Sequence, residues 1–367
     1  MSKARDIADS TTTLDVDGGT IKLDGNYPVG TNNVALGDNA GDAMASGGIG
    51  NTAIGSVALT DNTTGDNNTA VGYAALYVNS TGSENTAIGT EALQQSTTGS
   101  NGTAVGSAAL YANTTGAYNV AIGRSALESN TTASNNTAVG YQASYSSTET
   151  GGNTAVGYQS LYANTGSDNS ALGIRSLTSN TTGTKNTALG YDALTSNTTA
   201  AANTAVGYQA LTTNTTGGDN AAFGYQAAQS NTTGDYLTAI GRQALYNNTT
   251  ASYNTAVGYQ AAYSITGSQY NTAIGRGALY SHTTGNGGNV AVGYDANRSL
   301  TTGSNNVSVG ANAAYAMTTG LYNVALGGNA LRSNTTASNN TAVGYNAGYS
   351  NTTGIQNLFV GSDAGYA

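Results

Sequence analysis

The chain has 367 residues, of which only 8% are charged and 51 are glycine. An ordinary globular domain carries about 25% charged residues, so this composition excludes a conventional mixed surface and favours a repetitive fibre. A net charge of -9 with ten Lys and Arg provides no basic stripe for a phosphate backbone, which excludes nucleic acid from the expected partners. The chain has no Cys, so disulfides and thiolate chemistry are excluded as well.

Residues 1-30 differ from the rest of the chain. They hold eight of the 29 charged residues and the only proline, Pro28. The opening M-S-K-A-R-D-I-A-D-S is charged and is followed by no apolar stretch typical of a signal peptide, and no segment reaches the roughly 18 apolar residues of a membrane span. We predict that residues 1-30 form an N-terminal attachment or capping segment and that residues 31-367 form one repetitive domain.

From residue 31 onwards the chain repeats a unit that reads N-T-A-V-G-Y-Q-A-L-x-x-N-T-T-G-x-x. The glycine after the aliphatic residue, here called the anchor glycine, is separated from the next one by 17 residues in sixteen of nineteen cases, by 18 in two and by 16 in one. Such constancy indicates a folded repeat and not a disordered polar segment. The twenty anchor glycines are Gly37, Gly55, Gly72, Gly89, Gly106, Gly123, Gly140, Gly157, Gly173, Gly190, Gly207, Gly224, Gly241, Gly258, Gly275, Gly293, Gly310, Gly327, Gly344 and Gly361.

Each unit contains the signals of a short strand and a turn. Thr or Val, then Ala, then a branched aliphatic residue precede the anchor glycine and predict a strand of four or five residues. A second short strand is expected to follow, as in Ala75-Leu76 and Ala210-Leu211, and N-T-T-G closes the unit as a turn. Because 17 residues cannot bury an apolar face alone, the units must stack in parallel. We therefore predict an all-β fold, a parallel β-solenoid of about twenty coils.

Stacking places like residues in ladders along the solenoid. Asn and Thr are expected to form hydrogen bonds along the stack. Ala, two residues before the anchor, either fills a narrow coil interior or forms a small-residue stripe at which chains pack together, and the sequence leaves both interpretations open. The aliphatic residues directly before the anchor are predicted to form the coil core: Val71, Ile88, Val105, Ile122, Val139, Val156, Val206, Val257 and Ile274.

Several repeats resemble a known family. The motifs N-N-V-A-L-G at 32-37, Y-N-V-A-I-G at 118-123, N-N-V-S-V-G at 305-310 and Y-N-V-A-L-G at 322-327 resemble the head repeat of trimeric autotransporter adhesins. The resemblance implies a left-handed β-roll, three chains side by side, and two aliphatic residues of the motif pointing into each coil. The adhesin repeat is shorter, and that family carries a signal peptide and a membrane anchor. The longer unit and the opening S-K-A-R-D-I-A-D look more like phage tail-fibre-like proteins.

This second resemblance implies a structural virion protein, a homotrimeric phage tail fibre that is assembled in the host cytoplasm and contributes to host attachment. The expected partners are two further copies of the chain, other tail proteins at residues 1-30, and a host surface glycan or a further fibre protein at the C-terminal end. The alternatives are a bacterial cell-surface adhesin or extracellular filament subunit, and a polysaccharide-processing tailspike.

The tyrosines fall into three columns, one residue after the anchor, five after it and five before it. A repeated tyrosine column could bind a repetitive glycan, because Tyr offers a large amphipathic contact and many weak contacts add up. Alternatively, the rings stack along the solenoid or seal a seam between chains. The candidate receptor or seam tyrosines directly follow an anchor glycine: Tyr141, Tyr158, Tyr191, Tyr208, Tyr225, Tyr259, Tyr294 and Tyr345.

The sequence predicts no catalytic, cofactor or metal site. Carboxylates are scattered, and no pair recurs with the spacing that general acid-base catalysis would need. His282 is the only histidine, and since it occupies a turn position filled elsewhere by Asn, we predict a surface substitution. The protein is therefore not expected to be an enzyme.

Overall fold

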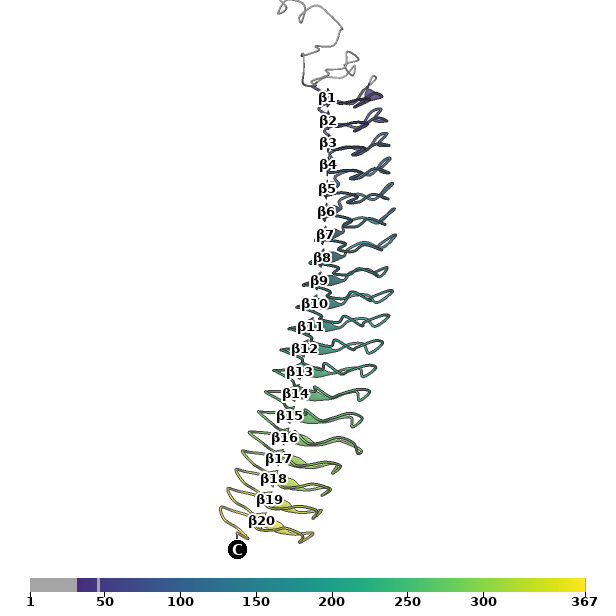
Figure 1. The fold of residues 1–367 in the computed structure, drawn as a ribbon. Helices are drawn as coiled ribbons and strands as arrows, with labels where there is room; N and C mark the ends of the chain where they lie inside the picture. The colour runs from purple at the N-terminus through teal and green to yellow at the C-terminus, as the bar shows by residue number, and fades with distance from the viewer. Residues whose placement is uncertain (1–31, 45–46, 367) are drawn as a thin grey trace, which may run out of the picture. The chain divides into compact units, whose positions relative to one another are not determined.

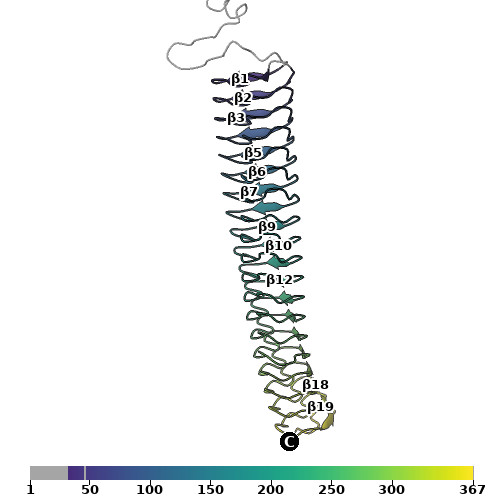
Figure 2. The same cartoon turned by 90° about the vertical axis from the view of Figure 1, so that its right-hand side faces the viewer.

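The computed structural model describes residues 32-44 and 47-366, so the predicted attachment segment at residues 1-30 lies outside the described residues. The chain divides into two units, Met1–Ile174 and Arg175–Ala367. The described part of each unit is a parallel β-solenoid in which every coil contributes one strand of three residues (Figures 1 and 2). No α-helix occurs among the described residues. The predicted all-β solenoid with a 17-residue repeat is confirmed.

The described residues contain twenty strands, which follow each other in chain order. The first unit contains β1 (Val34–Leu36), β2 (Thr52–Ile54), β3 (Thr69–Val71), β4 (Thr86–Ile88), β5 (Thr103–Val105), β6 (Val120–Ile122), β7 (Thr137–Val139), β8 (Thr154–Val156) and β9 (Ser170–Leu172). The second unit contains β10 (Thr187–Leu189), β11 (Thr204–Val206), β12 (Ala221–Phe223), β13 (Thr238–Ile240), β14 (Thr255–Val257), β15 (Thr272–Ile274), β16 (Val290–Val292), β17 (Val307–Val309), β18 (Val324–Leu326), β19 (Thr341–Val343) and β20 (Leu358–Val360).

Within each unit, neighbouring strands pair in parallel and in register. Ala87 of β4 is paired with Ala104 of β5, and Ala239 of β13 with Ala256 of β14. The irregular spacings do not disturb this register, because β8 pairs with β9 across the 16-residue spacing and β15 with β16 across an 18-residue one. The missing or extra residue is therefore absorbed outside the strand.

The interior of the coils is lined by alanine. The middle residue of the strand, such as Ala104 or Ala256, has no exposed surface. Successive side chains of a strand point to opposite faces, so the residues on either side of this alanine point outwards. Of the two roles left open for alanine, filling a narrow coil interior is therefore confirmed.

The predicted coil core is wrong, because the aliphatic residue before the anchor glycine lies on the outer face of the strand. Ile88, Ile122 and Ile274 are about two-fifths exposed, at 41%, 41% and 39%. The physical reason is the narrowness of the coil, in which the alanine of the strand and the buried leucine of the turn together fill the interior. The other predicted core residues are half-buried on the same outer face: Val71, Val105, Val139, Val156, Val206 and Val257.

The segment after the anchor glycine is a turn and not the second strand that we expected. Leu76 is fully buried, has a φ of 51° and donates its backbone N–H to the carbonyl of Ala92 in the next coil at 2.8 Å. Ala74 has the same left-handed φ and donates in the opposite direction, to Ser56 of the preceding coil. The turn thus continues the backbone ladder without strand geometry, and its leucines supply the bulky part of the core.

Two columns of buried asparagine complete the interior. In the first, the backbone N–H of Asn68 donates to Asn51 Oδ1 at 2.9 Å, and its side-chain amide donates to the carbonyl of Gly82 at 2.9 Å. In the second, Asn79 Nδ2 donates to Asn62 Oδ1 at 2.8 Å and to the same carbonyl at 2.9 Å. The expected hydrogen bonding along the stack is confirmed, but these asparagines are buried, because they satisfy the backbone groups of turns that water does not reach.

Candidate interaction surface

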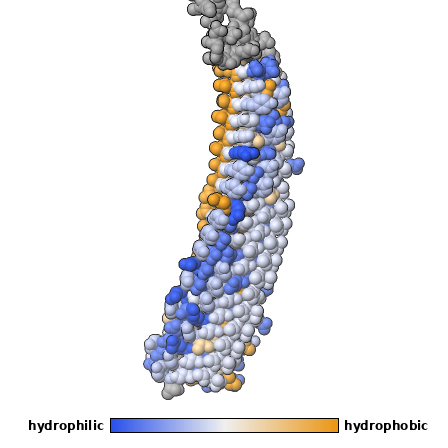
Figure 3. All heavy atoms as spheres, in the orientation of Figure 1, coloured by the Kyte–Doolittle hydropathy of each residue, from blue (hydrophilic) through white to orange (hydrophobic). Residues whose placement is uncertain are grey.

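The outward aliphatic residues form one apolar column on each unit, here called the outer apolar column. Its members are exposed or half-buried on consecutive coils, and Figure 3 shows the column of the first unit as an orange edge. In the first unit it consists of Leu36, Ile54, Val71, Ile88, Val105, Ile122, Val139, Val156 and Leu172. In the second unit it consists of Leu189, Val206, Phe223, Ile240, Val257, Ile274, Val292, Val309, Leu326, Val343 and Val360.

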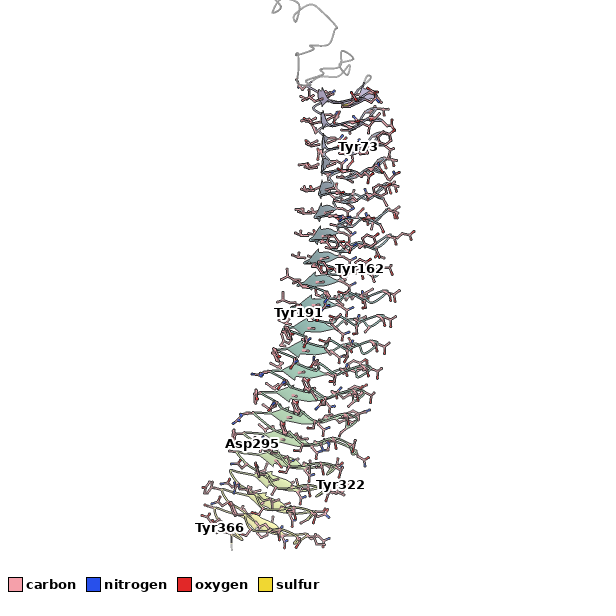
Figure 4. The ribbon with its side chains drawn as sticks, viewed as in Figure 1. Tyr73, Tyr162, Tyr191, Asp295, Tyr322 and Tyr366 are labelled. Carbon is pink, nitrogen blue, oxygen red and sulfur yellow. The ribbon has the colours of Figure 1, made fainter. Side chains whose placement is uncertain are left out.

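The structure separates the three tyrosine columns by exposure. All eight candidate tyrosines after an anchor glycine are exposed, from 37% at Tyr191 to 59% at Tyr345. Tyrosines five residues before an anchor are also exposed, as Tyr118 and Tyr322 illustrate. Those five residues after an anchor are half-buried, except Tyr366. Figure 4 shows that Tyr191 and Tyr322, from the two exposed columns, project from different sides of the second unit.

Adjacent tyrosines stack on one another along the coil axis. Tyr191 and Tyr208 have ring centroids 5.3 Å apart and an interplanar angle of 9°, and Tyr208 and Tyr225 repeat this geometry at 5.3 Å and 7°. Tyr141 and Tyr158 stack at 5.6 Å in the first unit. The expectation that the rings stack is confirmed. A consequence is that neighbouring rings cover much of each other's faces and leave their edges and hydroxyl groups to solvent.

Arginines occupy positions within these stacks. Arg242 lies over the rings of Tyr225 and Tyr259, with its guanidinium carbon 5.3 and 5.9 Å from the two centroids. Arg276 lies over Tyr259 and Tyr294 at 5.9 and 5.4 Å. The column therefore runs from Tyr191 through Tyr208, Tyr225, Arg242, Tyr259 and Arg276 to Tyr294, and we call it the tyrosine-arginine column.

Two other arginines of the second unit are neutralised by carboxylates. Arg175 forms an ion pair with Asp192 at 2.8 Å, and Arg298 one with Asp295 at 2.7 Å. These are the two ion pairs among the described residues, and both carboxylates are largely buried. Arg242 and Arg276 occupy the position after the anchor that tyrosine holds in other coils, but the sandwich between two rings depends on side-chain geometry and could not be predicted from the sequence.

Half-buried tyrosines of the third column have perturbed ionisation. The carboxylate of Glu128, whose Oε1 accepts a hydrogen bond from the Tyr145 hydroxyl at 3.3 Å, raises the pKa of Tyr145 by charge repulsion with the phenolate, and burial adds to this effect. Burial raises the pKa of Tyr263. Both tyrosines therefore stay neutral at physiological pH, so these two rings contribute packing and no charge.

The prediction that His282 is a surface substitution is wrong. Its side chain has no exposed surface, and its Nε2 lies 2.7 Å from the Oγ of Ser268. Burial lowers its pKa from 6.5 to about 4. The turn position that it shares with asparagine points into the coil, so the histidine is a neutral core residue.

Within residues 32-44 and 47-366, no group of three or more His, Cys, Asp or Glu side chains could hold a metal ion. The same part of the chain contains no helix long and apolar enough to cross a membrane. Comparison of the chain with protein-family models and with curated proteins finds no match.

Proposed function

We propose that the protein is a structural fibre, a homotrimeric phage tail fibre that contributes to attachment to the host surface. The observation that carries the trimer is the outer apolar column. Ile54, Ile88 and Leu172 in the first unit and Leu189 and Ile240 in the second are each at least 37% exposed. Monomeric soluble proteins rarely expose contiguous apolar patches larger than a few hundred Å². A partner that covers the column would remove this surface from water.

A second copy of the chain is the partner that fits the column best. The column repeats once per coil, and an identical solenoid presents apolar side chains with the same period. Three copies arranged around a common axis would bring three such columns together, which is a closed and symmetric assembly. Alanine has no part in this seam, because it is buried inside each coil.

A structural role is also favoured by the charges. The two largely buried carboxylates of the second unit, Asp192 and Asp295, each have an arginine partner. A hydrolase of polysaccharides would use two carboxylates facing a common cleft, one of them free to give up a proton. The assignment to a phage virion, in place of a bacterial adhesin, rests on the resemblance of the repeat unit and of the opening residues to tail-fibre-like proteins.

The trimer is tested by the mass of the full chain in solution, measured by light scattering. We expect three times 36.5 kDa for the wild type. Introducing Val257→Asp together with Ile274→Asp should lower the mass to that of one chain, because both substitutions place charges in the seam. The circular dichroism spectrum should persist, since both side chains point away from the coil interior.

The control is Thr250→Asp, which adds a charge on an exposed turn and should leave the trimer intact. A wild-type mass of one chain would overturn the trimer. Unfolding of the double variant would instead contradict the outward placement of the column. Antibodies raised against the protein should label phage tails, whereas labelling of the bacterial envelope would favour the adhesin.

A further inference from the structure

We propose that the tyrosine-arginine column of the second unit binds the carboxylate or phosphate groups of an acidic polysaccharide. This inference deepens the proposed function and rests on it, because it names the chemical class of the host surface component. The segment that carries it runs from Tyr225 through Arg242, Tyr259 and Arg276 to Tyr294.

Two guanidinium groups of the column carry charge that no carboxylate of the described residues neutralises. Arg242 and Arg276 are exposed, and among the described residues neither has a carboxylate within ion-pair distance, unlike Arg175 and Arg298. In a chain with a net charge of -9, two unpaired guanidinium groups on one column form a local positive site. An anion that binds there would meet positive charge that no carboxylate of the described residues neutralises.

The tyrosine rings orient both guanidinium groups. The N–H donors of a guanidinium lie in its plane. Tyrosine rings flank Arg242 and Arg276 on the coils before and after, and Arg276 Nη1 donates to the Tyr294 hydroxyl at 3.2 Å. Because both arginines are exposed, the solvent-side edge of each guanidinium keeps N–H donors for a ligand. This edge matches a carboxylate or phosphate, which accepts two parallel hydrogen bonds. The rings also hold each guanidinium in place, so less side-chain freedom is lost when an anion binds.

The column next to these arginines is polar and uncharged at Gln226, Gln243 and Gln260. Beside the arginines runs a ladder of glutamines, in which Gln243 Nε2 donates to Gln226 Oε1 at 3.1 Å and Gln260 Nε2 donates to Gln243 Oε1 at 3.0 Å. These neutral amides and the hydroxyl of Tyr259 offer hydrogen bonds to sugar hydroxyl groups without repelling an anion. The surroundings therefore suit a polar, negatively charged carbohydrate.

The spacing of the two arginines matches a polymer with regularly repeated acidic groups. Arg242 and Arg276 lie two coils apart, which is about 10 Å at the usual separation of neighbouring strands. This distance is comparable to the length of a disaccharide, so the site suits a polymer with an acidic group on every second sugar. Binding through sugar rings stacked on tyrosine faces is disfavoured, since neighbours in the column cover those faces.

The test measures binding of the full chain to three polymers by isothermal titration calorimetry at low ionic strength. Hyaluronan carries a carboxylate on every second sugar, poly(glycerol phosphate) carries phosphates, and dextran is neutral. We expect hyaluronan or poly(glycerol phosphate) to bind and dextran not to bind, and the stronger of the two identifies the acidic group. Arg242→Gln and Arg276→Gln should each weaken binding about tenfold or more, the effect of losing a charged hydrogen-bond donor.

The matched control is Arg332→Gln. The guanidinium carbon of Arg332 also lies between two rings, 5.7 and 5.6 Å from the centroids of Tyr315 and Tyr349, but in the half-buried column. This substitution therefore removes one positive charge at a position outside the proposed site. An equal loss of affinity in this control, or no binding of either acidic polymer, would overturn the proposal. Light scattering on the same samples separates the two proposals. If Arg242→Gln changes the mass of the particle in solution, the column lies in the seam between chains. If the wild-type protein has the mass of a single chain and still binds the polymer, only the trimer is contradicted.

Discussion

At the scale of single residues, the coil interior tolerates changes of chemistry as long as the shape fits. His282 replaces an asparagine of the second buried column and forms its hydrogen bond with Ser268 at 2.7 Å. Elsewhere in the same column Leu300 and Met317 are also buried. Ser96 and Ser147 are buried in this column too, so it accepts side chains from serine to methionine, and the histidine occupies it in its neutral form.

The buried histidine makes the stability of its coil depend on pH. Its pKa is about 4 in the folded chain and 6.5 in the unfolded chain. Between these values the unfolded chain binds a proton that the folded chain does not, so stability is full above about pH 6.5 and falls as the pH decreases towards 4. From pH 7 to pH 4.5 the wild type should lose about 2 kcal/mol more than His282→Asn. Native-state hydrogen exchange of the flanking coils measures this, and equal losses in both proteins would contradict it.

At the scale of the repeating element, the anchor glycine is required on two grounds. Gly258 has a φ of +136°, in the left-handed region that side chains rarely adopt. A Cβ added there would lie 2.7 Å from the backbone carbonyl of Gly275 in the next coil. The same contact recurs between Gly207 and Gly224 at 2.4 Å. Each coil thus closes against the bare backbone of the next one.

We expect Gly258→Ala to destabilise the surrounding coils by about 3 kcal/mol or more, since it combines backbone strain with a steric clash. Gly267→Ala is the matched control in the same coil, because its added Cβ meets nothing within 4 Å and its φ is not positive. Thermal unfolding followed by circular dichroism compares the two. If both variants unfold at the same temperature as the wild type, the anchor glycines do not approach each other as closely as the structure shows.

At the scale of the whole molecule, stability is a sum over coils that contact their neighbours in the stack. In-register pairing between β10 and β11 is repeated between β11 and β12 with the same geometry. Such repeat proteins behave approximately as one-dimensional arrays, in which each interface contributes separately. One coil is therefore dispensable if the register of the remaining coils is preserved.

Removal of residues 208-224, one complete repeat within the second unit, should give a folded solenoid with one coil fewer. The residue after Gly207 then becomes Tyr225, which occupies the same position as Tyr208, so every ladder is restored. Removal of residues 208-216 should instead unfold the adjacent coils, because it joins half a coil to a full one. Circular dichroism and hydrogen exchange distinguish the two, and similar behaviour of both deletions would contradict the one-dimensional description.

The sequence alone determined the architecture. The anchor glycines recur at 17 residues with three exceptions, and a fixed length per unit requires that each unit stacks on the previous one in register. Stacking then places identical residues next to each other whatever the details of the coil. The solenoid, the parallel pairing and the columns of tyrosine could therefore be predicted.

Only the tertiary structure decided which side chains face inwards. A strand of three residues such as Thr255–Val257 is compatible with either face inside, because alternation alone does not say which. The choice follows from how the chain closes. Ala74 and Leu76 adopt left-handed φ values of 51°, which local preference disfavours for residues other than glycine and which stacking stabilises. The resulting narrow coil holds alanine, leucine and asparagine inside and leaves the branched aliphatic residues, and the guanidinium groups between tyrosine rings, on the surface.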